Sequence, residues 1–328
     1  RAHGHSADPR YNGLALHVTL TAGHGSSPGA GVLASGRQAP LVALAGQKAP
    51  VTPIPSDWPC ASFALPRVGG RAANQAQNAL LRAAGWARFE ERVAAFTAAF
   101  AAAFRMASAV GVAGWSVADG VLCGALAEGL AYGRDRDALR LCGERLARDE
   151  PPDALLTTAA RLPSVEQQRL AGLLELFERW RALGPLATLA LALQAGAVRA
   201  GDAGAVRALT EALRVAEHGA VSLGRARILA FNVALPGMVA WARSQPDTAS
   251  AVSLSSLALT AAAALPGLPS NQITREMARQ LGLPRLPGGA LAQQGLQRLW
   301  ARHCREKRCC GCPCADPPVN SVLPKTGG

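Results

Sequence analysis

Residues 85–104 read GWARFEERVAAFTAAFAAAF, and their large apolar side chains recur at the spacing of an α-helix. One face of that helix carries Phe89, Val93, Phe96, Phe100 and Phe104. A stripe of this kind is typical of a helix packed against a core, so we assign it no functional role. The stretch predicts a fold that is mainly α.

Helical periodicity continues outward from this stretch over residues 74–303. Further helices are predicted at 117–132, 135–148, 164–183, 202–217, 222–243, 248–264, 271–282 and 289–303. Prolines lie between most of these ranges. A proline inside a helix removes a hydrogen bond and crowds the preceding turn, so these prolines are predicted to separate the helices. Pro236 is the exception, since it lies within an apolar helical run and predicts a kink or a helix end there.

The amino-terminal part has a different pattern. Residues 13–45 alternate and turn as strands do, which predicts a small α/β piece before the helical array. The predicted organisation is an α/β remnant at 1–50, a Pro-rich crossing segment at 51–73, a helical domain at 74–303, a cysteine cluster at 304–314 and a disordered tail at 315–328.

Composition bounds the class of protein. With 328 residues, 49% of them hydrophobic, the chain can bury one or two cores of ordinary size. Arg outnumbers Lys by 31 to 3 and the net charge is +12, which reflects either a GC-rich genome or a surface that binds phosphate.

Neither a signal peptide nor a clean apolar span of about twenty residues is visible, so we predict a cytoplasmic protein without a membrane partner. The closing LPKTGG lacks the apolar tail of a sorting signal, and we interpret it as accidental or as a tag.

Five cysteines crowd into the end of the helical part: Cys304, Cys309, Cys310, Cys312 and Cys314. Thiolates this close repel one another unless a cation lies between them or they form disulfides. We predict metal ligands at Cys304, Cys309 and Cys312, with Cys314 as the local candidate for a fourth and Cys310 as a poorer one. Zinc and an iron–sulfur cluster both remain open as cofactor, and a disulfide pair or free thiols are the alternative.

Basic residues precede and enter this cluster. Arg298, Arg302 and Arg305 share one helix face, with Lys307 and Arg308 just beyond, and they are candidate contacts to DNA or RNA phosphates. A solvated helix face explains the same pattern equally well.

Two further polar groups are candidate substrate contacts. Arg225 and Asn232 share a face of an otherwise apolar helix, where pairing within the fold is favoured over a ligand role. The second group lies near the start of the chain and consists of His3, His5, Asp8 and Tyr11.

Several strings, in order, resemble the bacterial family catalogued as domain of unknown function 2851. They are HGH at 3–5, DPRYN at 8–12, LHV at 16–18, GWARF at 85–89, GRAR at 224–227, NVALP at 232–236, NQITREM at 271–277 and QQGL at 293–296, followed by Cys304, Cys309, Cys312 and Pro313. The resemblance covers most of the chain up to Cys314.

The resemblance implies a region upstream of the HGH string that is similar to the core of metal-dependent nucleases, with an Asp and a Glu-x-Lys on adjacent strands. No positions of this chain match those carboxylates, so catalytic residues are not carried over, and magnesium is expected only in a full-length protein. Similarity to that nuclease class also implies a remote cysteine that completes an iron–sulfur cluster, for which Cys60 is the candidate here.

The expected function is therefore nucleic-acid binding, or nuclease-like activity in full length, with a structural metal centre and no catalysis by this chain. The alternative is a non-enzymatic helical scaffold or interaction protein with the same metal knuckle, and a third hypothesis is a redox-sensing thiol cluster. The sequence gives no indication of the oligomeric state.

Overall fold

The computed structural model describes residues 17–19, 31–32, 35–39, 41–43, 70–110, 114–131, 135–148, 164–216, 220–246, 248–283 and 285–315. The chain divides into two compact units, Arg1–Pro55 and Ser56–Gly328. The boundary falls inside the segment 51–73 that was predicted to cross between two parts.

The described residues of the first unit form four short strands: β1 (His17–Thr19), β2 (Gly31–Val32), β3 (Gln38–Ala39) and β4 (Leu41–Ala43). β1 pairs with β4 in parallel and β2 pairs with β3 in antiparallel. No helix accompanies these strands in the described part of the unit, so the predicted α/β piece stays a prediction.

The second unit is helical, which confirms the mainly α prediction. Its elements are α2 (Gly70–Val110), α3 (Gly114–Leu130), α4 (Arg136–Leu146), α6 (Ser164–Trp180), α7 (Gly184–Ala212), α8 (Leu223–Leu229), the π-helix η5 (Ala230–Ala234), α9 (Leu235–Ser244), α10 (Ala249–Ala264), α11 (Gln272–Gln280), α12 (Ala290–Leu299) and the π-helix η6 (Trp300–Cys304).

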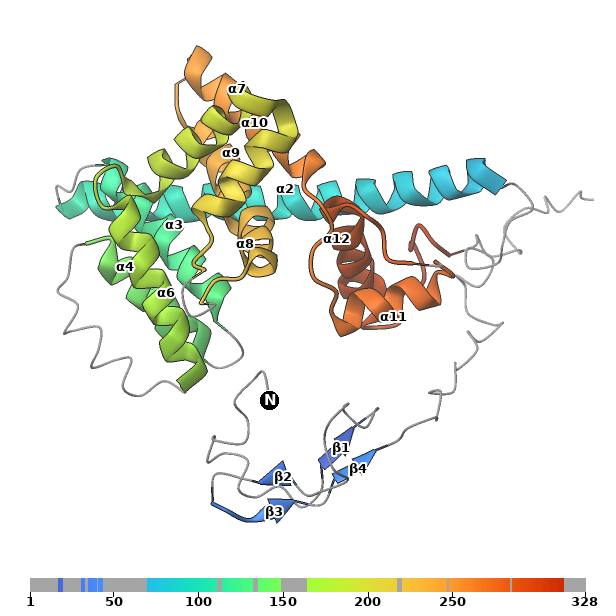
Figure 1. Cartoon of the computed structure of the whole chain (residues 1–328). Coiled ribbons are helices and arrows are strands. Elements are labelled where there is room, and N and C mark those ends of the chain that lie inside the picture. Colours follow the sequence, from blue (N-terminus) through green and yellow to red (C-terminus); the bar gives the residue numbers. More distant parts are fainter. Residues whose placement is uncertain are drawn as a thin grey trace, which may run out of the picture. The chain divides into compact units, whose positions relative to one another are not determined.

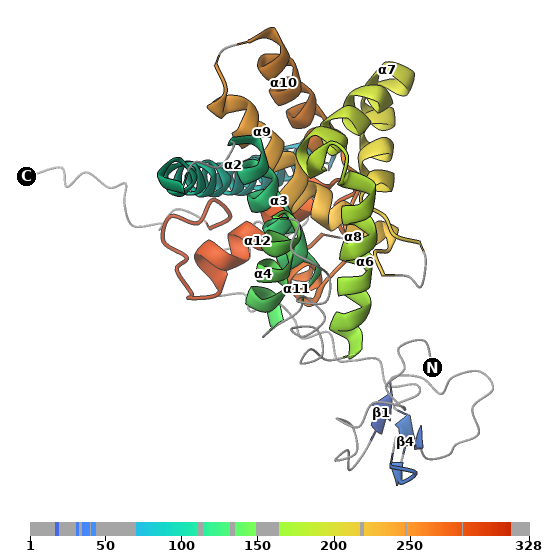
Figure 2. The same ribbon diagram turned by 90° about the vertical axis from the view of Figure 1, so that its left-hand side faces the viewer.

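The long helix α2 organises this unit. In Figure 1 it runs through the unit as a rod, with α3 and α9 against one half and α12 against the other, and Figure 2 looks nearly along its axis. Phe89 and Phe100 are fully buried, and the Phe89 ring meets the Phe231 ring edge to face with centroids 5.5 Å apart. The predicted apolar stripe is therefore a core stripe.

Two glycines let α2 and α12 approach backbone to backbone. A Cβ atom on Gly85 would lie 2.0 Å from the Leu291 carbonyl oxygen, and one on Gly295 would lie 2.0 Å from the Leu81 carbonyl oxygen. Since real Cβ contacts are never that short, any side chain at either position would push the helices apart. This contact places the carboxyl-terminal cysteines beside the amino-terminal half of α2.

The structure corrects one predicted boundary and confirms another. No helix was predicted between 183 and 202, yet α7 begins at Gly184 and breaks only at Ala200 and Gly201. The reason is that Pro185 lies in the first turn of α7, where a proline is tolerated and begins a helix instead of separating two. At Pro236 a kink or a helix end was predicted, and the α-helical pattern does end before it, since α8 stops at Leu229 and the π-helix η5 leads into α9 at Leu235.

No single helix in the described ranges is both long and apolar enough to cross a membrane. One pair bent by 75°, Gln167–Trp180 with Gly184–Ala212, meets the criteria of length and composition together.

Candidate metal centre

The segment that carries the cysteines folds back on the end of α12. In η6 the turn is wide, because the backbone N of Arg305 donates to the Trp300 oxygen five residues earlier, at 2.8 Å. Lys307 then takes a positive φ of 55° and Gly311 one of 78°. The backbone N of Cys312 donates to the Cys309 oxygen at 3.0 Å, which closes a tight turn with Gly311 at its third position. A positive φ at that position favours glycine.

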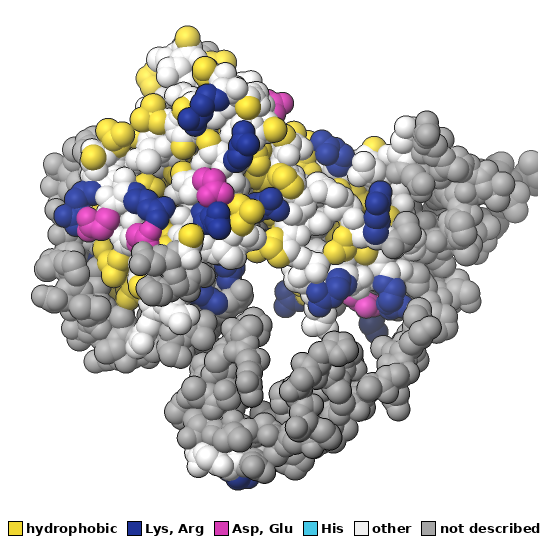
Figure 3. All heavy atoms as spheres, in the orientation of Figure 1, with side chains coloured by type: hydrophobic (Ala, Val, Ile, Leu, Met, Phe, Trp, Pro, Cys, Tyr) yellow, Lys and Arg dark blue, Asp and Glu magenta, His cyan; other side chains and the backbone are white. Residues whose placement is uncertain are grey.

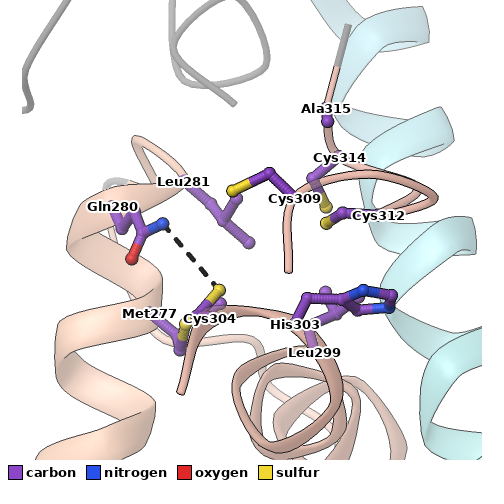
Figure 4. Close-up of a pocket in the computed structure, with 10 residues that line it drawn as sticks. All are labelled: Met277, Gln280, Leu281, Leu299, His303, Cys304, Cys309, Cys312, Cys314 and Ala315. Atoms are coloured by element: carbon purple, nitrogen blue, oxygen red, sulfur yellow. Dashed lines mark hydrogen bonds between the residues drawn. The ribbon is translucent and has the colours of Figure 1, made fainter. Parts of the chain in front are cut away.

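Four of the five clustered cysteines line one small cavity. Figure 4 shows Cys304 on one side and Cys309, Cys312 and Cys314 on the other, with Met277, Leu281 and Leu299 forming much of the wall. The cavity volume is about 20 Å³, which is room for one water-sized sphere. Cys310 is exposed and does not line the cavity, and Cys60 lies outside the described residues.

The sulfur atoms surround this cavity without forming a closed ligand set. Within the described ranges, no three His, Cys, Asp or Glu side chains lie close enough together to hold a metal ion. The cysteines of the same ranges are free thiols, and this includes Cys123 and Cys142, which are buried in the core.

The surroundings of Cys312 favour its thiolate. A hydrogen bond from the Cys314 thiol lowers the pKa of Cys312 to about 6, although burial opposes the shift, and backbone N–H groups and His303 add to it. The amide Nε2 of Gln280 donates to the Cys304 sulfur at 3.9 Å. Because the thiolate is the form that binds metals and attacks electrophiles, this loop presents an activated sulfur at neutral pH.

Several of the predicted phosphate contacts have partners within the chain. Arg298 Nε and Arg302 Nη2 both bond to Glu91 Oε1, at 3.2 and 2.8 Å. Burial acts to raise the pKa of Glu91, but the hydrogen bonds and charges of Arg302 and Arg298 outweigh it and lower that pKa. These two arginines therefore fasten the end of α12 and η6 to α2.

The remaining basic residues of that group lie at the surface. The Arg305 guanidinium lies over the Trp300 ring, 5.9 Å from its centroid, and Arg308 pairs with Glu306. The side chains of Arg305, Lys307 and Arg308 are exposed and remain accessible to a charged partner.

The other candidate contacts are only partly brought together. Arg225 lies in the first turn of α8, where its backbone N donates to the Ser222 cap, and Asn232 lies in η5. Asn232 lines a second cavity together with Arg92, a residue that sequence reasoning missed. His3, His5, Asp8 and Tyr11 lie outside the described residues.

Comparisons of the chain with protein-family models, with curated proteins and with solved structures found no match. The family resemblance therefore stays a prediction. Several described residues in its strings have roles in the fold: Asn271 and Thr274 form a reciprocal cap on α11, and Arg88 Nε donates to Gln294 Oε1 at 2.8 Å.

Proposed function

We propose that this chain is a non-catalytic, nucleic-acid-binding helical protein whose carboxyl-terminal loop is fixed by one metal ion held by Cys304, Cys309, Cys312 and Cys314. The observation that carries the proposal is that these four thiols, from the end of η6 and the loop that follows it, line a single cavity. The chain's membership of the resembled family, its nuclease-like amino-terminal piece and its cytoplasmic location are parts of the same proposal.

The donor set supports a structural ion over a catalytic one. Four thiolates complete a tetrahedral site and leave no open position for substrate, and the number and type of donors suit zinc. A cavity of about 20 Å³ suits one ion better than a four-iron cluster. The four sulfurs would have to close in on the ion, for which the lowered pKa of Cys312 already provides one thiolate.

The ion would stabilise the smaller of two buried clusters. Cys314 is 4% exposed and packs with Leu81 of α2, Met277 of α11 and Leu296 of α12. A metal bridge from Cys304 to the loop would therefore fix the loop, and with it Cys314, against these three helices.

The test is elemental analysis and thermal unfolding of the full chain purified under reducing conditions. We expect about one zinc per chain, and we expect Cys312→Ser to lose the metal and to lower Tm. Cys310→Ser is the matched control and should retain both. Equal losses in the two variants, or wild-type protein that neither contains nor responds to zinc, would overturn the proposal. Iron with a broad visible absorption band would replace zinc with an iron–sulfur cluster.

The nucleic-acid part of the proposal is supported by charge. Residues 271–315 contain eight Arg or Lys and two Asp or Glu. On the face in Figure 3 basic side chains gather over α11, which carries Arg275 and Arg279. We expect binding to a labelled DNA or RNA duplex that weakens steeply with salt and no cleavage when magnesium is added.

One observation favours the alternative of a scaffold without nucleic-acid binding. Arg298 and Arg302, which the sequence offered as phosphate contacts, are bonded to Glu91 within the fold. Indifference to nucleic acid at low salt, with the metal present, would favour this scaffold.

A further inference from the structure

A second cavity, separate from the cysteine site, lies between α2, α3, the start of α4 and the α8–η5 segment. Its volume is about 450 Å³, which is enough for a small organic molecule. Apolar side chains such as Phe96 and Val233 form part of its wall, and its polar lining consists of Arg92, Glu128, Arg136 and Asn232. The combination of an apolar wall with a few polar groups is typical of ligand sites.

Arg92 brings a charge into this cavity that pairs with no carboxylate among the described residues. Its Nη1 donates to the Asn232 carbonyl oxygen at 3.3 Å, while its Nε is buried and has no hydrogen-bond partner in the described structure. The adjacent carboxylate, Glu91, is engaged by Arg298 and Arg302. Buried guanidinium groups are normally paired with carboxylates. The environment of Arg92 therefore favours the binding of an anion.

The pKa of Arg92 reports the same environment. Burial lowers it to about 10, with the charges of Arg88 and Arg136 adding to the effect and Glu91 opposing it weakly. Positive potential is therefore concentrated where the cavity wall meets α2.

Pro236, just after the π-helix η5, explains why the backbone carbonyl of Asn232 accepts a hydrogen bond from Arg92. In a regular helix the Asn232 carbonyl would accept from the backbone N of residue 236, but that residue is Pro236, which has no N–H and crowds this carbonyl. The carbonyl accepts from Arg92 instead. The side-chain Oδ1 of Asn232 is buried and has no donor in the described structure. Such π-helical turns occur frequently at functional sites.

Arg136 supplies a second cation at the more exposed side of the cavity. Its Nη2 lies 2.6 Å from Glu128 Oε1, and its side chain is 58% exposed. An incoming anion can share Arg136 with Glu128, because a guanidinium carries several donors.

We propose that this cavity binds a small amphiphilic anion: an oxyanion group, carboxylate or phosphate monoester, on Arg92 and Arg136, with an apolar body against Phe96 and Val233. The inference does not depend on the metal centre or on nucleic-acid binding.

The test is thermal unfolding and calorimetry with 4-hydroxybenzoate and phenyl phosphate, and phenol serves as the neutral analogue. We expect one or both anions to bind with one site per chain and to raise Tm, and phenol to bind at least about tenfold more weakly. A response to only one anion identifies the oxyanion as carboxylate or phosphate.

Variants separate a binding role for Arg92 from a structural one. Arg92→Met should weaken anion binding by at least about tenfold, while Tm without ligand stays unchanged or rises because a buried, unneutralised charge is removed. Arg136→Met, at an exposed position, should weaken binding less. Arg140→Met is the matched control, since Arg140 is exposed on α4, pairs with Glu144 and does not line the cavity.

Three results would overturn the proposal. They are the absence of binding of either anion to the wild-type protein, equal binding of phenol, and an Arg92→Met variant that loses its fold or binds as well as wild type.

Discussion

Asp119 fixes the junction between α3 and α7 through a single buried carboxylate. The residue is 7% exposed, and its Oδ1 accepts a hydrogen bond from the backbone N of Leu186 at 2.9 Å. Burial raises the pKa of Asp119, although the Leu186 bond opposes the shift. Gly184, with a φ of 78°, makes room for the carboxylate, because a Cβ there would lie 2.4 Å from Oδ2. The start of α7 is therefore set by a buried carboxylate whose pKa lies above its ordinary value.

This arrangement predicts that variants without the carboxylate differ in stability from wild type by an amount that depends on pH. Since the folded pKa lies above the unfolded one, the contribution of Asp119 to stability is present at low pH and is lost as pH rises through the folded pKa. Asp119→Asn keeps an acceptor for Leu186 without this titration, so its stability relative to wild type should increase from acidic to neutral pH. Asp119→Ala lacks the same titration but also leaves the Leu186 N–H without its partner, so it should be less stable than Asp119→Asn by about 1–3 kcal/mol at both pH values. Urea unfolding at the two pH values measures both, and a relative stability of Asp119→Asn that falls with pH would contradict the assignment.

The two candidate sites differ in how far the sequence could predict them. The cysteine cluster is a local signal, and spacing alone indicated Cys304, Cys309, Cys312 and Cys314. Arg92 gives no such signal. The adjacent carboxylate, Glu91, does not pair with it because Glu91 bonds to two arginines about two hundred residues later in the chain. A local clue did exist: Pro236 frees the carbonyl of Asn232, and a freed carbonyl requires a donor.

At the scale of elements, helix periodicity was sufficient for most of the array. The predicted ranges 164–183 and 248–264 correspond closely to α6 and α10. The contact between α2 and α12 could not be predicted, since a glycine that permits backbone contact is the same in sequence as one that merely weakens a helix. Gly85 and Gly295 lie in the strings GWARF and QQGL that carry the family resemblance, and packing gives them a physical reason.

We expect Gly295→Ala to destabilise the protein by about 1–3 kcal/mol, because the added methyl would overlap the Leu81 carbonyl and force α2 and α12 apart. Gly120→Ala is the matched control in α3, where the nearest atom to a new Cβ is Ala147 Cβ at 3.8 Å. There the better helix propensity of alanine should stabilise by about 0.5–1 kcal/mol. Denaturant unfolding of both variants gives the comparison, and similar effects in the two would show that the close contact has no energetic weight.

The whole molecule has 34 Lys and Arg against 22 Asp and Glu, which gives its net charge of +12. Some of the arginines form ion pairs within the fold. Arg243 with Glu90 and Arg302 with Glu91 fasten helices to α2. Exposed pairs of this kind contribute roughly 0–1 kcal/mol each, so the stability of the unit rests on its main apolar core, to which α2, α3, α4, α6, α7, α9 and α10 contribute. The surplus positive charge is thus available for recognition without a large cost in stability.

The salt dependence of the proposed nucleic-acid binding tests which basic residues contact the phosphates. If Arg305 and Lys307 contact phosphates, the double variant Arg305→Ala/Lys307→Ala should reduce the slope of log affinity against log salt by about 1.8, because each phosphate contact contributes about 0.9. Arg181→Ala/Arg214→Ala removes the same charge from exposed positions that pair with Glu178 and Glu211, and its slope should stay near that of wild type. Fluorescence anisotropy with one labelled duplex over a range of salt concentrations provides the slopes. An equal fall in both double variants would mean that binding follows net charge, in which case the cysteine loop is not the contact surface.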